Sequence, residues 1–132
     1  MIALVDTSVW IDFLRQPAGS VPELELALRE GRAALCPVVW VELWSGARGK
    51  AEEAILLEMR ALCLPLEMDA ATWQRAAELN RAAARNGVSC PLADVLIVAC
   101  AMCHGTILLH RDKHIDTLLA LAAPPGAEGG SQ

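Results

Sequence analysis

The chain has 132 residues, of which 55% are hydrophobic and 4% aromatic, and its formal net charge at pH 7 is −5. This length suits one ordinary domain with a mainly aliphatic core. The acidic balance argues against a protein that binds nucleic acid through bulk electrostatic attraction. It does not exclude a nuclease, because clustered acids that hold metal ions also make a sequence acidic.

The beginning of the chain and its cysteines indicate the compartment. Residues 1–5 are apolar but lack a basic flank, so we expect no signal peptide. No apolar run approaches the ~18 residues that a membrane span needs, so we expect no membrane association. The five cysteines are an odd number and suit reduced, buried thiols. We therefore expect a cytoplasmic protein.

The predicted elements alternate between short apolar strands and helices. Residues 2–5 are wholly apolar and predict a buried parallel strand. Thr7 and Ser8 are natural N-caps for the helix that follows, and residues 17–22 form a break. The further predictions, in chain order, are a helix over 22–30, a strand over 33–36, helices over 38–48 and 50–61, an edge or short strand within 62–68, helices over 70–85 and 91–104, a buried strand over 106–109 and a helix over 112–121.

This alternation predicts an α/β fold with a short, mostly parallel central sheet flanked by helices on both faces. We expect residues 1–122 to form a single domain. Residues 123–132 are rich in proline and glycine, with nothing to bury, and predict a disordered tail.

Four acids lie where an α/β sheet binds its ligands. Asp6 and Asp112 each come soon after a predicted strand, Asp94 lies in the first turn of the 91–104 helix, and Glu42 lies on the helix after the second strand. Ligands of open α/β sheets bind beyond the carboxyl ends of the strands. We therefore expect the four carboxylates to converge on one edge of the sheet.

Such a cluster takes up either protons or a cation, because like charges raise one another's pKa. All-oxygen ligands suit Mg²⁺ or Mn²⁺. A divalent ion held in this way favours metal-assisted hydrolysis of phosphodiester bonds.

Each acid also has a simpler interpretation. Asp6 and Asp112 could be ordinary helix N-caps, and Asp94 could be a first-turn acid stabilised by the helix dipole. Glu42 could be a solvated helical residue, although its helix face is small and half apolar, which favours a pocket wall.

A different motif, Cys100-Ala-Met-Cys103-His104, has the spacing of covalent haem attachment. Haem would require an exported chain and a second axial ligand, and neither is indicated. A zinc site would require a second Cys/His pair of matching spacing. We therefore expect no haem, and expect both cysteines to pack within the helix.

Four segments that carry the acids resemble the PIN-domain ribonucleases, and more narrowly the VapC toxins of toxin–antitoxin pairs. They are LVDTSVWIDFLR (residues 4–15), VELWSG (41–46), LADVLIVACAMCHG (92–105) and LLHRDKHID (108–116). The resemblance implies a PIN-like fold and an endoribonuclease dependent on Mg²⁺ or Mn²⁺. It also implies RNA as substrate, a homodimer, and a cognate antitoxin whose C-terminal segment lies across the active-site groove.

The resemblance also assigns roles to residues. The resemblance implies a catalytic quartet of Asp6, Glu42, Asp94 and Asp112. Within this quartet, the resemblance ties Asp6 and Asp94 most directly to metal. We expect Asp112 to be a third metal ligand. Ser8 and Asp116 match supporting positions, Asp116 either near a second ion or facing solvent, and Asp12 looks structural. His110 stands where many members have Thr or Ser. Arg111 and Lys113 either meet an RNA backbone or are solvated charges, and the four tryptophans suit core or interface packing better than base stacking.

Two other functions compete with cleavage. One is a catalytically idle PIN module that binds an antitoxin or RNA without cutting it. The other is a phosphatase or phospho-receiver, but the first strand lacks the Asp-x-Asp that haloacid-dehalogenase-like phosphatases need.

Overall fold

The central sheet is short and entirely parallel in the computed structural model, which describes residues 1–122. Its strands are β1 (Ala3–Val5), β2 (Ala33–Leu35), β3 (Leu64–Pro65) and β4 (Ile107–Leu109). They lie in the order β3-β2-β1-β4, with Ala3 opposite both Ala33 and Ile107. The predicted α/β class is therefore confirmed. The predicted disordered tail, residues 123–132, lies outside the described residues.

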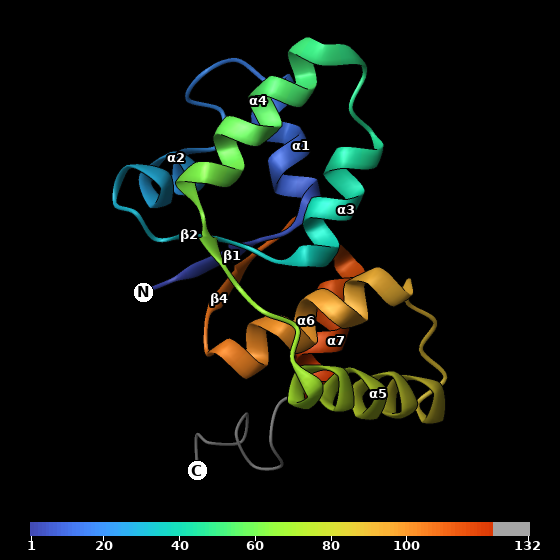
Figure 1. The fold of residues 1–132 in the computed structure, drawn as a ribbon. Coiled ribbons are helices and arrows are strands. Elements are labelled where there is room, and N and C mark those ends of the chain that lie inside the picture. The colour runs from blue at the N-terminus through green and yellow to red at the C-terminus, as the bar shows by residue number, and fades with distance from the viewer. Residues whose placement is uncertain (123–132) are drawn as a thin grey trace.

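Helices cover both faces of this sheet (Figure 1). Helices α1, α2 and α4 lie on one side, and α6 and α7 lie on the other, with α5 packed against α6. The helix bounds are α1 Thr7–Arg15, α2 Pro22–Arg29, α3 Pro37–Ser45, α4 Gly49–Leu62, α5 Ala70–Arg85, α6 Leu92–His104 and α7 Lys113–Ala122. None of the helices within residues 1–122 is long and apolar enough to cross a membrane.

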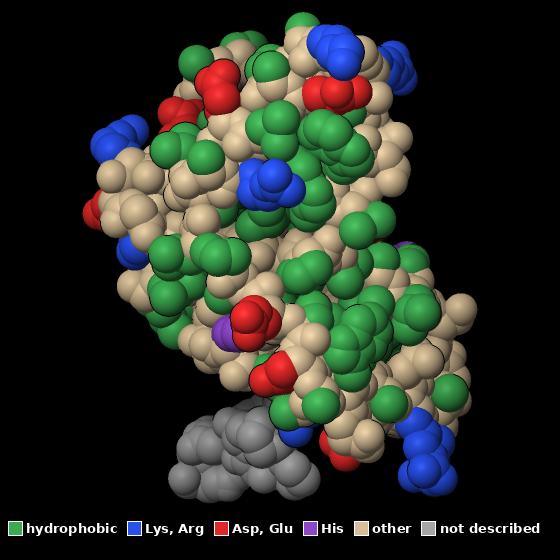
Figure 2. Space-filling model, in the orientation of Figure 1, with side chains coloured by type: hydrophobic (Ala, Val, Ile, Leu, Met, Phe, Trp, Pro, Cys, Tyr) green, Lys and Arg blue, Asp and Glu red, His purple; other side chains and the backbone are tan. Residues whose placement is uncertain are grey.

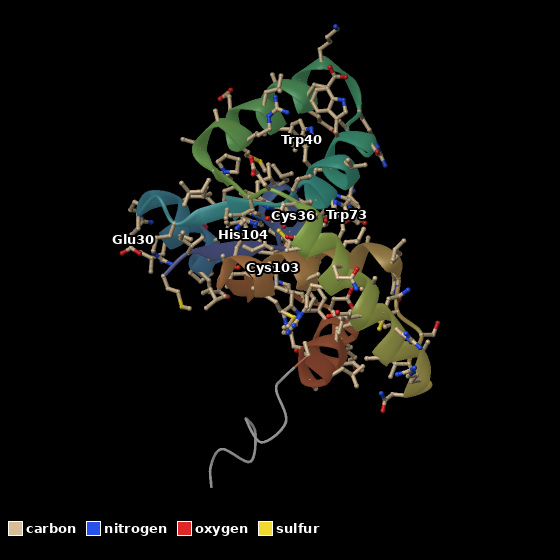
Figure 3. All side chains as sticks on the ribbon, turned by 60° about the horizontal axis from the view of Figure 1, so that its bottom comes forward. Glu30, Cys36, Trp40, Trp73, Cys103 and His104 are labelled. Carbon is tan, nitrogen blue, oxygen red and sulfur yellow. The ribbon has the colours of Figure 1, made fainter. Side chains whose placement is uncertain are left out.

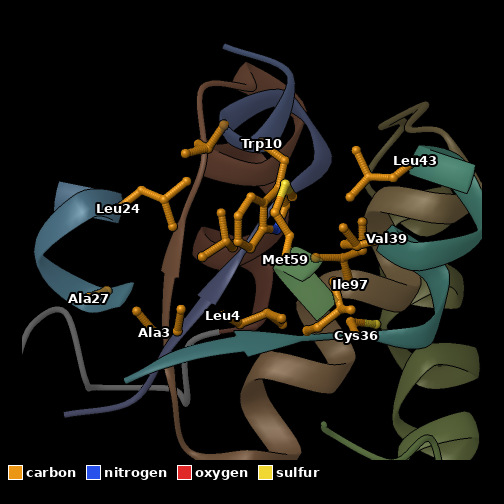
Figure 4. Close-up of a cluster of buried hydrophobic side chains, with 14 of the residues drawn as sticks. Ala3, Leu4, Trp10, Leu24, Ala27, Cys36, Val39, Leu43, Met59 and Ile97 are labelled. Carbon is orange, nitrogen blue, oxygen red and sulfur yellow. The ribbon is translucent and has the colours of Figure 1, made fainter. Parts of the chain in front are cut away.

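The core has two parts that meet at α6. In the first, Trp10 and Leu4 are fully buried between the sheet and helices α1–α4 (Figure 4). In the second, Val95 of α6 packs with Ile115 and Leu118 between α5, α6 and α7. A helix buried on most sides must be apolar all round, which explains why α6 is so hydrophobic. Gly105 ends α6 in the left-handed conformation at φ 64°, which glycine adopts without a Cβ penalty.

Three local predictions were wrong. The N-cap of α1 is Asp6 rather than Thr7 or Ser8, which confirms the simpler interpretation of that acid: its backbone is still extended, and Oδ2 accepts a hydrogen bond from the Ser8 amide at 3.1 Å. Helix α3 spans Pro37–Ser45 instead of residues 38–48, because proline opens the first turn and Gly46 follows the last. Strand β4 is an edge strand, so Ile107 is 39% exposed instead of buried.

The cysteines are free thiols, but their burial differs from the prediction. Cys36 and Cys100 are fully buried in the first part of the core. Cys103 is exposed, and the remaining two are partly buried. The expectation that Cys103 packs inside was wrong, because α6 emerges from the core over its last turn. His104 contacts the backbone oxygen of Glu67 through Nε2 at 2.8 Å, so this imidazole is engaged at the end of α6 (Figure 3).

Three of the four tryptophans make packing contacts, whereas Trp73 of α5 is 52% exposed. Trp10 is fully buried and meets Phe13 edge-on. Trp40 of α3 stacks on Trp44 with ring centroids 5.2 Å apart, and the Arg60 guanidinium of α4 lies 4.2 Å from the Trp40 ring centre. These contacts join α3 to α4 (Figure 3).

Candidate metal centre

The acids gather at one edge of the sheet because strands β1, β2 and β4 are parallel and end there. The Asp6 amide donates a hydrogen bond to the Leu109 carbonyl at 2.9 Å, so the loops after β1 and β4 leave the sheet side by side. Helix α6 begins at Leu92 and places Asp94 in its first turn. The structure thus brings residues from three separate segments to a common edge.

Asp94 is buried at this edge, with 8% of its surface exposed. Its Oδ2 is fully buried, with no hydrogen-bond partner among the described residues. Burial and the nearby carboxylates of Asp112 and Asp6 raise the Asp94 pKa to about 7, while His114 opposes the rise. A buried carboxylate without a donor is unfavourable unless a proton or a cation balances its charge.

Asp112 and His114 stand beside Asp94. The Asp112 Oδ1 accepts a hydrogen bond from the His114 amide at 2.8 Å, a contact typical of a helix N-cap, here before α7. The His114 Nδ1 lies 3.2 Å from Asp112 Oδ1 and 3.8 Å from Asp94 Oδ2. One ligand atom from each of these three residues lies within 4.8 Å of the other two.

His114 is absent from the sequence-based set of site residues. The signal that could have found it is its position two residues after Asp112, in the first turn after the strand end. That spacing does not fix the direction of the ring, which only the packing of α7 against α6 decides.

Asp6 is 2% exposed and is held by Ser8. Both the amide and the hydroxyl of Ser8 donate to Asp6 Oδ2. The Ser8 hydroxyl oxygen also accepts a hydrogen bond from the Arg111 amide at 3.2 Å. Ser8 thereby links the end of β1 to the loop after β4. Asp6 contributes charge to Asp94, but its ligand atoms are not within the 4.8 Å group.

Glu42 lies next to this edge rather than inside the group. Its Oε1 accepts a hydrogen bond from the Thr7 hydroxyl at 2.5 Å. The Glu42 side chain is exposed and borders a cavity of about 400 Å³ between α1, α3 and α4, whose apolar wall includes Ile11 and Leu56. A pocket-wall position was one of the two sequence interpretations.

Four other residues that the sequence singles out, His110, Arg111, Asp12 and Asp116, form two ion pairs. His110 Nε2 lies 3.2 Å from Asp116 Oδ1, and the Asp116 side chain is 74% exposed. Arg111 Nε lies 3.0 Å from Asp12 Oδ2 and ties the β4–α7 loop to α1. Asp12 therefore has a structural contact, and Asp116 faces solvent.

The donor set fits a divalent cation. Asp94 Oδ2 is buried and unpartnered, Asp112 faces it, and both carboxylates are of the type that Mg²⁺ and Mn²⁺ accept. Asp94 and Asp112 would hold the ion, and His114 lies beside both carboxylates.

Comparisons with known proteins agree with this geometry. A family model described as the PIN domain matches residues 3–118. The chain is 32% identical over 121 residues to VapC ribonuclease Mb1587 of Mycobacterium bovis, covering 87% of this chain and 90% of that protein. Ribonuclease VapC11 of Mycobacterium tuberculosis matches with the same identity and coverage.

Solved structures show the same fold. The crystal structure of VapBC2 from Rickettsia felis, bound to a DNA fragment from their promoter, superposes with a TM-score of 0.76 at 20% identity, covering 89% of this chain and 92% of that one. VapBC-5 from Mycobacterium tuberculosis gives a TM-score of 0.67 at 24% identity, covering 89% and 91%. The protein therefore belongs to the PIN-domain family and, within it, to the VapC ribonucleases.

Proposed function

We propose that this protein is the toxin of a type II toxin–antitoxin pair and that it hydrolyses RNA phosphodiester bonds with Mg²⁺ or Mn²⁺. The observation that carries the proposal is the buried, unpartnered Asp94 carboxylate facing Asp112 in a VapC-family chain. Such a pair is an unfavourable arrangement for an idle protein and a suitable one for a metal nuclease. The nuclease domain comprises residues 1–122, in the cytoplasm.

The proposed catalytic residues are Asp6, Glu42, Asp94 and Asp112, in different roles. Asp94 and Asp112 bind the ion, and Asp6, fixed by Ser8, adds negative charge behind them. A bound divalent ion would supply an activated water and stabilise charge on the phosphate.

Glu42 is suited to proton transfer. The Thr7 hydroxyl engages its Oε1, so Oε2 is the atom that we propose accepts a proton from the attacking water. Exposure of Glu42 at the cavity rim leaves it accessible to substrate. Arg111, in the loop after β4, and Lys113, the first residue of α7, are both exposed and would meet the RNA backbone.

Partners follow from the family and from the surface. Several solved structures of similar fold are described as VapBC or toxin–antitoxin complexes, and we propose that a cognate antitoxin neutralises this chain. We also propose a homodimer. Hydrophobic side chains gather over α3 and α4 in Figure 2, and Val41 and Trp44 of α3 are 62% and 39% exposed. Exposed apolar side chains in a group of this kind favour a protein interface.

RNA cleavage by the purified, antitoxin-free chain tests the function. Wild type should cleave RNA with Mg²⁺ or Mn²⁺ and lose activity in chelator. Asp94→Asn should lose cleavage while folding normally. Asp69→Asn is the matched control, because Asp69 caps α5 through the Thr72 amide, far from the carboxylate pair, and asparagine caps helices equally well.

Two outcomes would contradict the proposal. Cleavage by Asp94→Asn at the wild-type rate would remove the assigned site. A wild-type chain that binds its antitoxin but cleaves no RNA with either ion would instead identify the idle binding module. Mapping the 5′ ends of the fragments would then define the RNA target of an active enzyme.

A further inference from the structure

One nitrogen donor stands among the oxygens of the candidate metal centre. His114 begins the exposed surface of α7, with its side chain 51% exposed, while its Nδ1 faces the two carboxylates. His114 is outside the acidic quartet that defines the proposed active site. Its position raises the question of whether the ring is a counter-charge or a ligand.

The interatomic distances suit ligands of one ion. Metal–ligand bonds of roughly 2.1 Å in octahedral geometry place adjacent ligand atoms about 3 Å apart and opposite ones about 4 Å apart. Nδ1 lies 3.2 Å from Asp112 Oδ1 and 3.8 Å from Asp94 Oδ2. The 3.2 Å separation is close to that of adjacent ligands, and the 3.8 Å separation lies between the adjacent and the opposite values, so a small movement of the half-exposed ring completes the geometry. Because the ring reaches solvent, Nε2 can carry the proton of the neutral imidazole while Nδ1 keeps its lone pair.

A nitrogen ligand changes which ion the site prefers. Mg²⁺ takes oxygen ligands and retains several waters, whereas imidazole suits transition metals. The Asp94–Asp112 carboxylates alone would accept either ion, and the addition of His114 gives a mixed nitrogen and oxygen set.

We infer that His114 is a direct metal ligand through Nδ1 and that it makes this site selective for Mn²⁺ over Mg²⁺. This inference rests on the proposed metal-dependent function and adds its ion preference. In this arrangement His114 of α7 determines which metal is preferred, whereas the Asp94 and Asp112 carboxylates supply the negative charge that balances the ion.

Equilibrium binding of Mn²⁺ and of Mg²⁺ to the antitoxin-free chain tests the preference without measuring catalysis. In His114→Ala, the affinity for Mn²⁺ should fall at least roughly tenfold, because even the loss of a residue that only supports a metal ligand has an effect of that size. The affinity for Mg²⁺ should change much less. Lys113→Ala is the charge control, because Lys113 is an exposed cation on the same turn; its two affinities should change together.

Pulsed electron paramagnetic resonance of the bound Mn²⁺ tests coordination itself. Wild type should show coupling to a ¹⁴N nucleus, and His114→Ala should lose it. His110→Ala should retain the coupling, because His110 binds Asp116 through Nε2 and accepts the Asp112 amide through Nδ1.

The inference is overturned if the nitrogen coupling survives in His114→Ala, or if that variant loses or gains affinity for both ions equally, as a simple counter-charge would. Neither result bears on RNA cleavage. Failure of the proposed function would appear separately, as a wild-type chain that binds the ions but cuts no RNA.

Discussion

Replacing Asp94 by asparagine should stabilise the metal-free protein above neutral pH, although it removes the proposed activity. The asparagine side chain keeps the shape and a hydrogen-bond donor toward Asp112 but carries no charge. In wild type, burial and the neighbouring carboxylates raise the Asp94 pKa from 3.8 to about 7. The folded chain therefore prefers the protonated form of this carboxyl.

The sign of the pH dependence follows from this shift. Below about pH 4 the carboxyl is neutral in both the folded and the unfolded chain, and its contribution to stability is fully present. The unfolded chain releases this proton at about pH 4, whereas the folded chain keeps it until the pH reaches about 7. The stability of wild type therefore falls as the pH rises to and through about 7. At about 1.4 kcal/mol per pKa unit, the loss by pH 8 is at most ~4 kcal/mol.

Urea unfolding in chelator, followed by tryptophan fluorescence, measures this difference. Asp94→Asn should exceed wild type in free energy of unfolding at about pH 8 and should match it more closely at about pH 5. Added Mg²⁺ or Mn²⁺ should stabilise wild type by mass action and leave the variant unchanged. Asp116→Asn is the control, because that acid is 74% exposed and should give no comparable gain.

The reasoning is refuted if Asp94→Asn is no more stable than wild type at about pH 8, or if its advantage is the same at both pH values. The first result would mean that the Asp94 charge is already balanced within the folded chain. The second would mean that shape, rather than charge, accounts for the effect.

Three further predictions concern the cap, the core and the thiols. Asp6→Asn should lose cleavage at little cost in stability, whereas Asp6→Ala should also lose the α1 cap and about 1 kcal/mol of stability. Urea unfolding of the two variants measures this difference, and equal stabilities would contradict the capping role. Leu118→Ala should lower the free energy of unfolding by about 2–5 kcal/mol, because this side chain is fully buried. Leu92→Ala removes a side chain that is 59% exposed and should lower it far less. Similar denaturation midpoints for the two variants would argue against the second part of the core. A thiol reagent should modify exposed Cys103 in the native protein and spare buried Cys100 until unfolding, and mass spectrometry after digestion distinguishes the two sites.

The sequence alone determined the fold class and the edge at which the acids meet. Short apolar runs that alternate with helices require a parallel sheet with crossover helices, and the ends of parallel strands share one edge. The places of Asp6 and Asp112, each soon after a strand, are therefore readable from the order of elements. The cap of α5 at Asp69 and the glycine stop of α6 are equally local, because both depend on residues only a few positions apart.

Tertiary structure decided what depends on distant segments. Asp94 is buried beside Asp112 and His114, which come from a distant segment, and the approach of His114 to it joins residues twenty positions apart in the chain. The exposure of β4 follows from its place at the edge of the sheet, and the link from Thr7 to Glu42 follows from the meeting of α1 and α3. Local patterns specify an element and its buried face, but strand order and the direction of a side chain after a turn are set only when the helices pack. For that reason the edge at which Asp6, Asp94 and Asp112 lie was predictable from the sequence, and the histidine beside Asp94 and Asp112 was not.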